Sequence, residues 1–95
     1  MTQMNKLMNL LDIAEIPYEV TENLGTPQVW YPSRKNVVCD VICHQYSYGG
    51  RDGLLEIMGL VNEEDIGDEV EGYLDAIEVF CRIFNNYYGK EPKGE

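Results

Sequence analysis

Two stretches of the chain carry apolar residues at the three-to-four spacing of an amphipathic helix. The first runs from Met4 to Glu15 and stops ahead of Pro17, because a residue that precedes proline avoids helical backbone. The second begins after Asp75, which stands three residues before Glu78 as in a capping box. Gly89 is expected to cap its other end. The pattern therefore predicts one helix near each end of the chain.

Between these helices the apolar residues alternate or form short runs, which is typical of strands. The predicted strands are Tyr18–Thr21, Gln28–Tyr31, Val37–Tyr46, Leu54–Val61 and Val70–Leu74. The segments between them are expected to be a loop at Asn23–Pro27, turns at Pro32–Asn36 and Ser47–Gly53, and an acidic loop at Asn62–Glu71. A helical turn is the alternative for Leu54–Val61, because short apolar runs are ambiguous.

The elements predict an α+β fold, in which a small antiparallel β-meander of three to five short strands is packed by an N-terminal and a C-terminal helix. A small sheet with one apolar face is unstable until something covers it, and the two amphipathic helices are the available cover. A length of 95 residues fits one domain. We expect residues 1–89 to form that domain and residues 90–95 to be a polar tail.

Side chains alternate between the two faces of a strand. One predicted face is apolar and is expected to join the core; it carries Val37, Cys39, Val41, Cys43, Leu55 and Ile57. The other face mixes apolar and charged groups, and it carries Val38, Asp40, Ile42, His44, Tyr46, Leu54, Glu56 and Met58, with Trp30 from the neighbouring strand. The candidate surface on this face is Trp30, Asp40, Ile42, His44, Glu56 and Met58. Such a mixture suits an interface, where apolar anchors are ringed by polar groups. The alternative is a solvated outer face, or one partly covered by a helix.

Acidic residues are concentrated just before the last predicted strand. The run comprises Glu63, Glu64, Asp65, Asp68, Glu69 and Glu71. Its order does not fit the register of an EF-hand, which argues against calcium. It is either a patch that meets a basic protein surface or a solvated loop ahead of a helix, whose N-terminus favours acids.

Charge narrows the classes of partner. The chain has 17 acidic and 7 basic residues and a formal net charge of −10. Phosphate backbones and anionic membranes repel such a surface, so we expect neither direct nucleic-acid binding nor membrane binding. A basic protein partner is favoured, although the charge also serves solubility.

The location is expected to be the cytoplasm of a bacterial cell. The chain shows neither a signal-peptide pattern nor an apolar run of roughly 20 residues, the length that a membrane span needs. Its three cysteines, Cys39, Cys43 and Cys81, form no disulfide framework and are expected to be unpaired, as in a reducing compartment.

The sequence contains no recognisable catalytic or metal-binding motif. On a strand, Cys39 and Cys43 would lie about 13 Å apart and His44 would point to the other face, too far apart for tetrahedral zinc. His44 could act as a general base, but no nucleophile is placed beside it. The glycine-rich segment from Tyr48 to Gly53 lacks the ending of a phosphate loop and reads as a tight turn. We therefore expect no cofactor, no metal and no catalytic residue, and whether the protein is an enzyme stays open.

Several stretches together carry a resemblance to a known group. They are Ile16–Val20, Tyr31–Ser33, Val38–Ile42, the run from Tyr48 through Asp52–Leu60, and Gly72–Leu74 leading into Glu78–Phe80 and Arg82–Ile83. The chain resembles a family of small proteins, without an assigned activity, of Gram-positive bacteria and their phages or prophages. The resemblance implies a setting and no residue roles.

Three hypotheses of function follow. The first is a non-enzymatic acidic interaction protein, encoded by a phage or prophage, that modulates a host or viral protein; a homodimer is one form of such an interaction. The second is a small-molecule-binding or sequestering module that uses the Tyr48–Gly53 turn and the mixed sheet face. The third is a small hydrolase or metal enzyme centred on His44.

Overall fold

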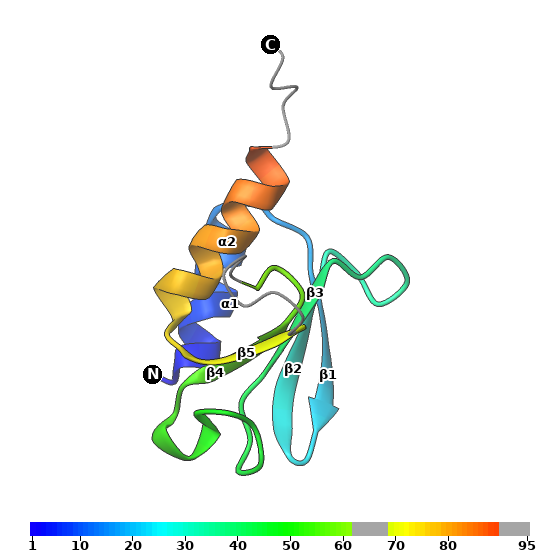
Figure 1. Ribbon diagram of the computed structural model, residues 1–95. Coiled ribbons are helices and arrows are strands. Elements are labelled where there is room, and N and C mark those ends of the chain that lie inside the picture. Colours follow the sequence, from blue (N-terminus) through cyan, green and yellow to red (C-terminus); the bar gives the residue numbers. More distant parts are fainter. Residues whose placement is uncertain (62–68, 90–95) are drawn as a thin grey trace.

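A computed structural model describes residues 1–61 and 69–89, and it has two helices and one sheet (Figure 1). The helices are α1 (Gln3–Ile13) and α2 (Ala76–Tyr88). The strands are β1 (Glu19–Asn23), β2 (Thr26–Tyr31), β3 (Cys39–Ile42), β4 (Leu55–Met58) and β5 (Val70–Leu74), and a short 3-10 helix, η1 (Gly50–Asp52), precedes β4. The strands follow the order β1-β2-β3-β4-β5, and each pairs antiparallel with its neighbour. The predicted α+β meander with a helix from each end is confirmed.

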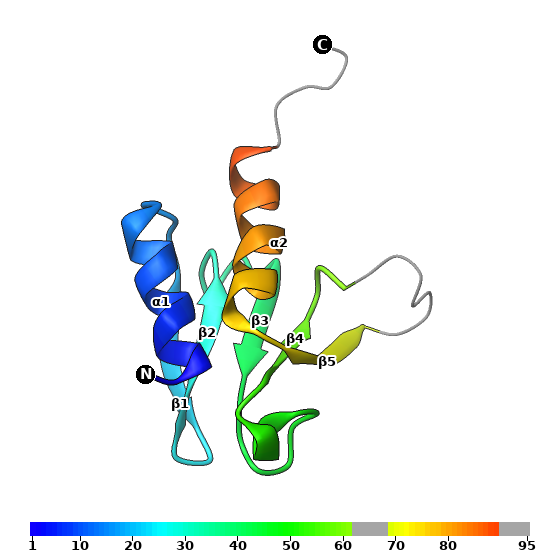
Figure 2. The ribbon, with the colours of Figure 1, turned by 90° about the vertical axis from the view of Figure 1, so that its left-hand side faces the viewer.

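Both helices lie side by side against one face of the sheet (Figure 2). Their buried faces meet the inward side chains of β2 to β5 in a single core. The core consists of Met4, Leu7, Leu11, Ile16, Val29, Tyr31, Cys39, Val41, Leu55, Ile57, Leu74, Ala76, Val79 and Ile83. The opposite face of the sheet is covered by none of the described elements, and we call it the outer face.

Helix α1 begins at a capping threonine and ends before the proline that was predicted to stop it. The hydroxyl of Thr2 accepts a hydrogen bond from the amide of Asn5 at 3.0 Å, which satisfies one of the first free amides of the helix. Ala14 is the last cap residue, and Glu15 has left-handed backbone with a φ of 60°. The helix therefore starts one residue earlier and ends two residues earlier than the pattern predicted.

The connection between β1 and β2 differs from the loop predicted at Asn23–Pro27. A two-residue turn, Leu24–Gly25, joins the strands, and both residues have positive φ, 52° and 81°. Two consecutive positive φ values are what a tight hairpin requires. Pro27 lies inside β2 opposite Glu22, and it is tolerated there because the register with β3 begins only at Val29.

The third strand is shorter than the predicted Val37–Tyr46. It comprises Cys39–Ile42, so the alternation of faces does not extend to its flanks. Cys39 and Val41 are fully buried as expected, but Val37 is 44% exposed and Cys43 is only half-buried, which corrects the predicted core face. The run around Leu55 is a strand, so the alternative of a helical turn there is wrong, but β4 comprises only Leu55–Met58 and not the predicted Leu54–Val61.

Helix α2 begins where the capping pattern predicted. The carboxylate of Asp75 accepts a hydrogen bond from the amide of Glu78 at 2.8 Å, while the carboxylate of Glu78 lies 3.3 Å from the guanidinium of Arg82. Gly89 is the C-terminal cap residue and donates its amide to Asn85. The predicted polar tail, 90–95, lies outside the described residues.

Replacing Asp75 by alanine should lower the free energy of unfolding by about 0.5–2 kcal/mol, because the Glu78 amide loses its acceptor. Urea denaturation of wild type and variant measures the difference. Asp75→Asn is the matched control, because it keeps a side-chain oxygen acceptor and should retain most of the stability. Equal losses in both variants would show that the charge, and not the cap, matters.

Candidate interaction face

The register of the sheet brings the predicted mixed face together on the outer face. Trp30 is paired with Asp40, and Asp40 with Met58, so these three form one row across β2, β3 and β4. Ile42 is paired with Glu56 in the next row. We define the mixed patch as these five residues, Trp30, Asp40, Ile42, Glu56 and Met58.

Trp30 is held in a fixed orientation. Its indole Nε1 donates a hydrogen bond to the hydroxyl of Thr21 on β1 at 2.8 Å. The guanidinium of Arg34 lies 5.9 Å from the centroid of the ring, within cation–π range. The Arg34 amide in turn donates to the Glu19 carboxylate at 2.9 Å, which fixes the backbone that carries the guanidinium. The large aromatic side chain is thus half-buried and held by contacts with Thr21 and Arg34.

A chain of side-chain hydrogen bonds positions the carboxylate of Asp40. Gln28 Nε2 donates to Asp40 Oδ2 at 2.8 Å, and Asn23 Nδ2 donates to Gln28 Oε1 at 3.2 Å. These contacts run from β1 through β2 to β3. They orient an acidic group beside Trp30 without cancelling its charge, because every donor in the chain is neutral.

The apolar members of the mixed patch stay accessible to solvent. Met58 is 49% exposed, and Ile42 and Trp30 are half-buried. Met58 is also paired with Val70 on β5, which continues the apolar row to the edge of the sheet. A flexible methionine beside a fixed tryptophan is a surface that can adapt its packing to a partner.

Three exposed tyrosines lie in the turn after β3 or on β5. Strand alternation had placed Tyr46 on the mixed face, and Tyr48 was named as the start of the glycine-rich turn, whereas Tyr73 was not a candidate. Tyr46, Tyr48 and Tyr73 are between 61% and 70% exposed. Tyr48 donates its amide to the Glu56 carboxylate at 2.7 Å and accepts at its carbonyl from the Tyr73 amide at 3.2 Å. Tyr73 has left-handed backbone with a φ of 61°. In the sequence, Tyr48 and Tyr73 each stand beside a glycine.

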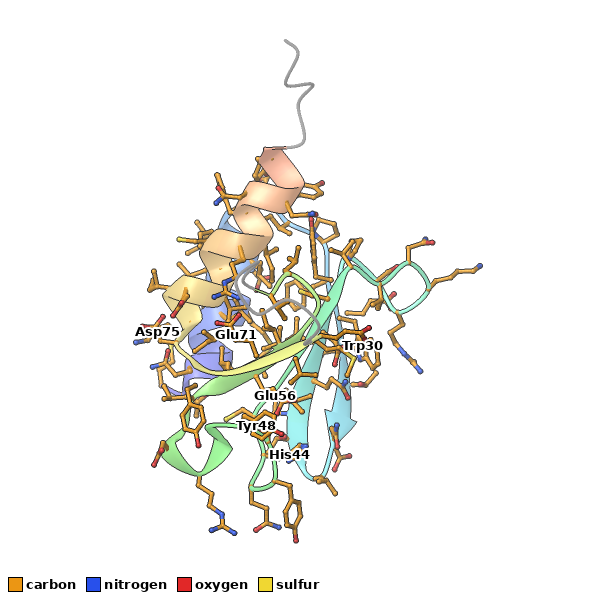
Figure 3. The ribbon with its side chains drawn as sticks, viewed as in Figure 1. Trp30, His44, Tyr48, Glu56, Glu71 and Asp75 are labelled. Carbon is orange, nitrogen blue, oxygen red and sulfur yellow. The ribbon has the colours of Figure 1, made fainter. Side chains whose placement is uncertain are left out.

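The structure places His44 in the turn and not on a strand face. Its Nδ1 accepts from the Tyr46 amide at 3.1 Å, and its backbone is bonded at both amide and carbonyl by the hydroxyl of Ser47. His44, Tyr48 and Glu56 gather at one end of the sheet, whereas Trp30 lies farther along it (Figure 3). The predicted strand position of His44 is therefore wrong. The Nδ1 lone pair serves the turn, and this contact gives no support to general-base chemistry at that atom.

The predicted acidic loop is only partly described. Glu63, Glu64, Asp65 and Asp68 lie outside the described residues, and Glu69 is exposed just before β5. The prediction that Glu71 belongs to the acidic loop is wrong, because this residue lies within β5 and is paired with Ile57, on the helix side of the sheet. It is not part of a solvated loop.

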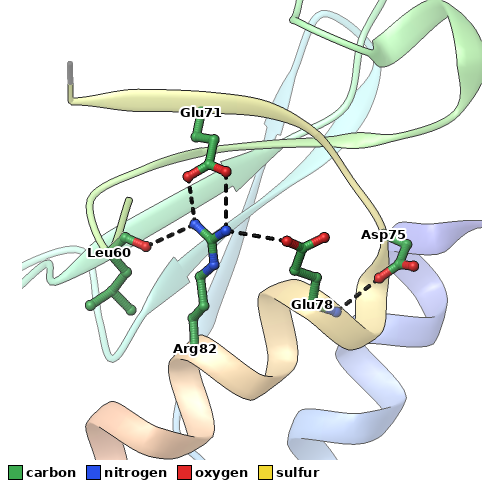
Figure 4. Close-up of polar contacts among 5 residues, drawn as sticks. All are labelled: Leu60, Glu71, Asp75, Glu78 and Arg82. Carbon is green, nitrogen blue, oxygen red and sulfur yellow. Dashed lines mark hydrogen bonds and ion pairs between the residues drawn. The ribbon is translucent and has the colours of Figure 1, made fainter. Parts of the chain in front are cut away.

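Glu71 makes a bidentate ion pair with Arg82 of α2 (Figure 4). The distances from Arg82 Nη1 and Nη2 to the two carboxylate oxygens are 2.7 and 3.0 Å, and Nη1 also donates to the carbonyl of Leu60 at 3.1 Å. The hydrogen bonds with Glu71 raise the pKa of Arg82 above its usual value. The side chains are only 19% and 20% exposed, so the pair ties β5 to α2 and is structural.

Two further observations bear on the site. Among residues 1–61 and 69–89, no group of three His, Cys, Asp or Glu side chains is placed to hold a metal ion. Within the same residues, neither helix has the length and apolar character needed to cross a membrane.

The three cysteines are unpaired thiols that differ in burial. Cys39 is buried and Cys81 is exposed, and burial raises the pKa of Cys39 to about 12. Because the thiolate is the nucleophile, we expect a thiol reagent at pH 8 to modify Cys81 fast, Cys43 more slowly and Cys39 only on unfolding. Mass spectrometry of the native and urea-unfolded protein gives the three rates. Rapid native modification of Cys39 would contradict its placement in the core.

No protein-family model, curated protein or solved structure matches this chain.

Proposed function

We propose that this protein is a non-enzymatic interaction domain that binds a basic protein through the mixed patch of its outer face. The observation that carries the proposal is the arrangement of the layers. Both helices cover one face of the sheet, while the other face presents Trp30, Ile42 and Met58 between the carboxylates of Asp40 and Glu56. Folding alone does not require a tryptophan and a methionine on that side.

The apolar residues supply the anchor of the proposed interface. Hot spots of binding are enriched in tryptophan and lie where neighbouring groups can exclude water. Trp30 is already ordered by Thr21 and Arg34, so little side-chain entropy is lost when a partner covers it. The exposed tyrosines at the end of the sheet add rigid contact area of the same kind.

Charge selects the class of partner. The net charge of −10 produces a negative potential, which speeds the encounter with a basic surface and disfavours an acidic one. Glu19, Asp40 and Glu56 all lie on the outer face by the register of the strands, and Glu69 stands exposed at its edge. In the phage or prophage setting that the resemblance implies, the partner would be a basic host or viral protein whose activity is modulated by being covered.

The test measures association and dissociation rates for a basic partner captured on the immobilised protein. Trp30→Ala should increase the dissociation rate about 30-fold, which corresponds to the loss of about 2 kcal/mol expected at a hot spot. Ile77→Ala is the matched control, because Ile77 is 54% exposed on α2 and lies in the helix layer. It should leave both rates unchanged.

A second pair of variants tests the charge. Asp40→Asn combined with Glu69→Gln should slow association, and the difference from wild type should shrink at 1 M salt, where the Debye length is only about 3 Å. Glu15→Gln removes an exposed acid at the end of α1 and serves as the control. A partner whose dissociation rate is unaffected by Trp30→Ala, but is increased by Ile77→Ala, would move the interface to the helices and overturn the proposal.

A further inference from the structure

A cavity of about 370 Å³ lies on the helix side of the sheet, beneath the start of α1. Its walls come from four parts of the chain, namely residues 1–4 at the start of α1, the start of β2, the residue just after β3, and residues 52–54 at the end of η1. The lining residues are Met1, Thr2, Gln3, Met4, Thr26, Pro27, Cys43, Asp52, Gly53 and Leu54. None of them belongs to the mixed patch, so the cavity is a separate site.

The size of the cavity is that of a ligand site. Ligand pockets span about 300–1,000 Å³, whereas packed interiors hold few voids larger than one water. The pocket is open to solvent on one side, since Met1, Asp52 and Gly53 in its lining are exposed.

The walls of the cavity are fixed by hydrogen bonds. On the helix side, Gln3 Oε1 accepts from the amide of Ala76 at 2.7 Å, which ties the start of α1 to the start of α2. On the sheet side, the amides of Gly53 and Leu54 donate to the carbonyls of Gly50 and Gly49 at 3.0 and 2.9 Å. A cavity with fixed walls binds its ligand with a smaller ordering cost.

The lining chemistry restricts the ligand. Apolar groups dominate, and they include the side chains of Met4, Pro27 and Leu54. Burial raises the pKa of the Cys43 thiol, which favours its uncharged form. Asp52 has the only carboxylate side chain in the lining. It is exposed, and it makes no ion pair within the described part of the chain.

We propose that this cavity binds a small apolar molecule that carries one ammonium group. The apolar part packs against Met4, Pro27 and Leu54, and the ammonium group lies beside the carboxylate of Asp52. The net charge of −10 raises the local concentration of such a cation. The ligand covers Cys43, which gives the site a chemical reporter.

The experiment follows the alkylation of Cys43 by iodoacetamide in a Cys81→Ser variant, with benzylamine and benzyl alcohol as probes. The two probes share the ring and differ in charge. Benzylamine should slow the modification of Cys43 at lower concentration than benzyl alcohol does. Asp52→Asn should weaken benzylamine binding about two- to fivefold, the range of an exposed ion pair, and should leave benzyl alcohol unchanged.

Two further variants test whether the probes bind in this cavity. Leu54→Trp places an indole in the cavity and should abolish protection by both probes, while Glu15→Gln, at the far end of α1, should change neither. Chemical shifts of the Thr26 and Leu54 amides report binding in the wild-type protein independently of any variant. Absence of protection and of shift changes up to the solubility limit would overturn the site. Equal affinity for the two probes, unaltered by Asp52→Asn, would overturn the proposed class of ligand.

Discussion

Replacing Gly50 by alanine is expected to lower the free energy of unfolding by about 3–5 kcal/mol, a large part of the total stability of a small domain. A β-carbon at this position would lie 1.8 Å from the carbonyl oxygen of His44 and 2.4 Å from the hydroxyl of Ser47. Both atoms belong to the hydrogen-bonded turn, so neither can move without breaking the bonds that close it. Urea denaturation followed by circular dichroism measures the loss.

Gly53→Ala is the matched control for the effect of the clash. Gly53 has a positive φ of 77°, but a β-carbon there would have no heavy atom within 4 Å. Alanine in left-handed backbone costs about 1–2 kcal/mol, so this variant should be the milder of the two. If both substitutions cost the same, backbone conformation and not packing against His44 and Ser47 would limit the turn.

The elements that the sequence predicted well are those whose signals are local. The start of helix α2 after Asp75 was predicted because the capping residue and the first apolar residues of the stripe lie within one helical turn. The strand β5 matches the predicted Val70–Leu74, and the alternation of Leu55 and Ile57 identified the buried face of β4. Such patterns can be recognised in the sequence because the residues that form them lie close together along the chain.

The errors occur where a distant or unusual contact decides the structure. Alternation continues beyond Ile42 in the sequence, but the hydrogen bonds between Ser47 and the backbone of His44 end the strand there. Leu24 adopts left-handed backbone, a conformation that a leucine in the sequence does not indicate, so the tight hairpin was not predicted. Glu71 looked like one more acid in an acidic run, because its partner Arg82 is on another element.

The candidate patch shows the same division. Period-two alternation selected Trp30, Asp40, Ile42, Glu56 and Met58, and the strand register then placed them as neighbours. Alternation could not show that Trp30 is oriented by Thr21, because that contact depends on which strand lies beside β2. It also could not show that Tyr48 and Tyr73 meet, since the contact joins the turn before β4 to β5. The alternation of residues along a strand predicts which side chains share a face, whereas the pairing of strands determines which of those side chains are neighbours.

Trp30 and Tyr31 are adjacent aromatic residues whose side chains point to opposite faces of β2. Substitutions at Tyr31 therefore test the stability of the core, and substitutions at Trp30 test binding at the outer face. Tyr31 is 1% exposed, its hydroxyl donates to Asn86 Oδ1 at 2.6 Å, and its ring packs edge-on against Tyr87 at 6.4 Å between centroids. Burial raises the pKa of Tyr31 to about 12, so the hydroxyl stays a donor across the neutral range. It connects the centre of the sheet to the last turns of α2.

Tyr31→Ala is expected to lower the free energy of unfolding by about 3–5 kcal/mol, because it leaves a cavity and removes the contact with α2. Tyr31→Phe should cost about 1–2 kcal/mol, since it removes only the hydrogen bond to Asn86. Trp30→Ala, on the outer face, should cost less than Tyr31→Ala and should leave the near-ultraviolet circular dichroism of the core tyrosines largely unchanged. Urea unfolding, followed by the fluorescence of Trp30 as the single tryptophan in the two Tyr31 variants, measures the first two costs. If Trp30→Ala destabilised the fold as much as Tyr31→Ala, Trp30 would be a structural residue, and the outer face would lose the anchor on which its proposed role in binding depends.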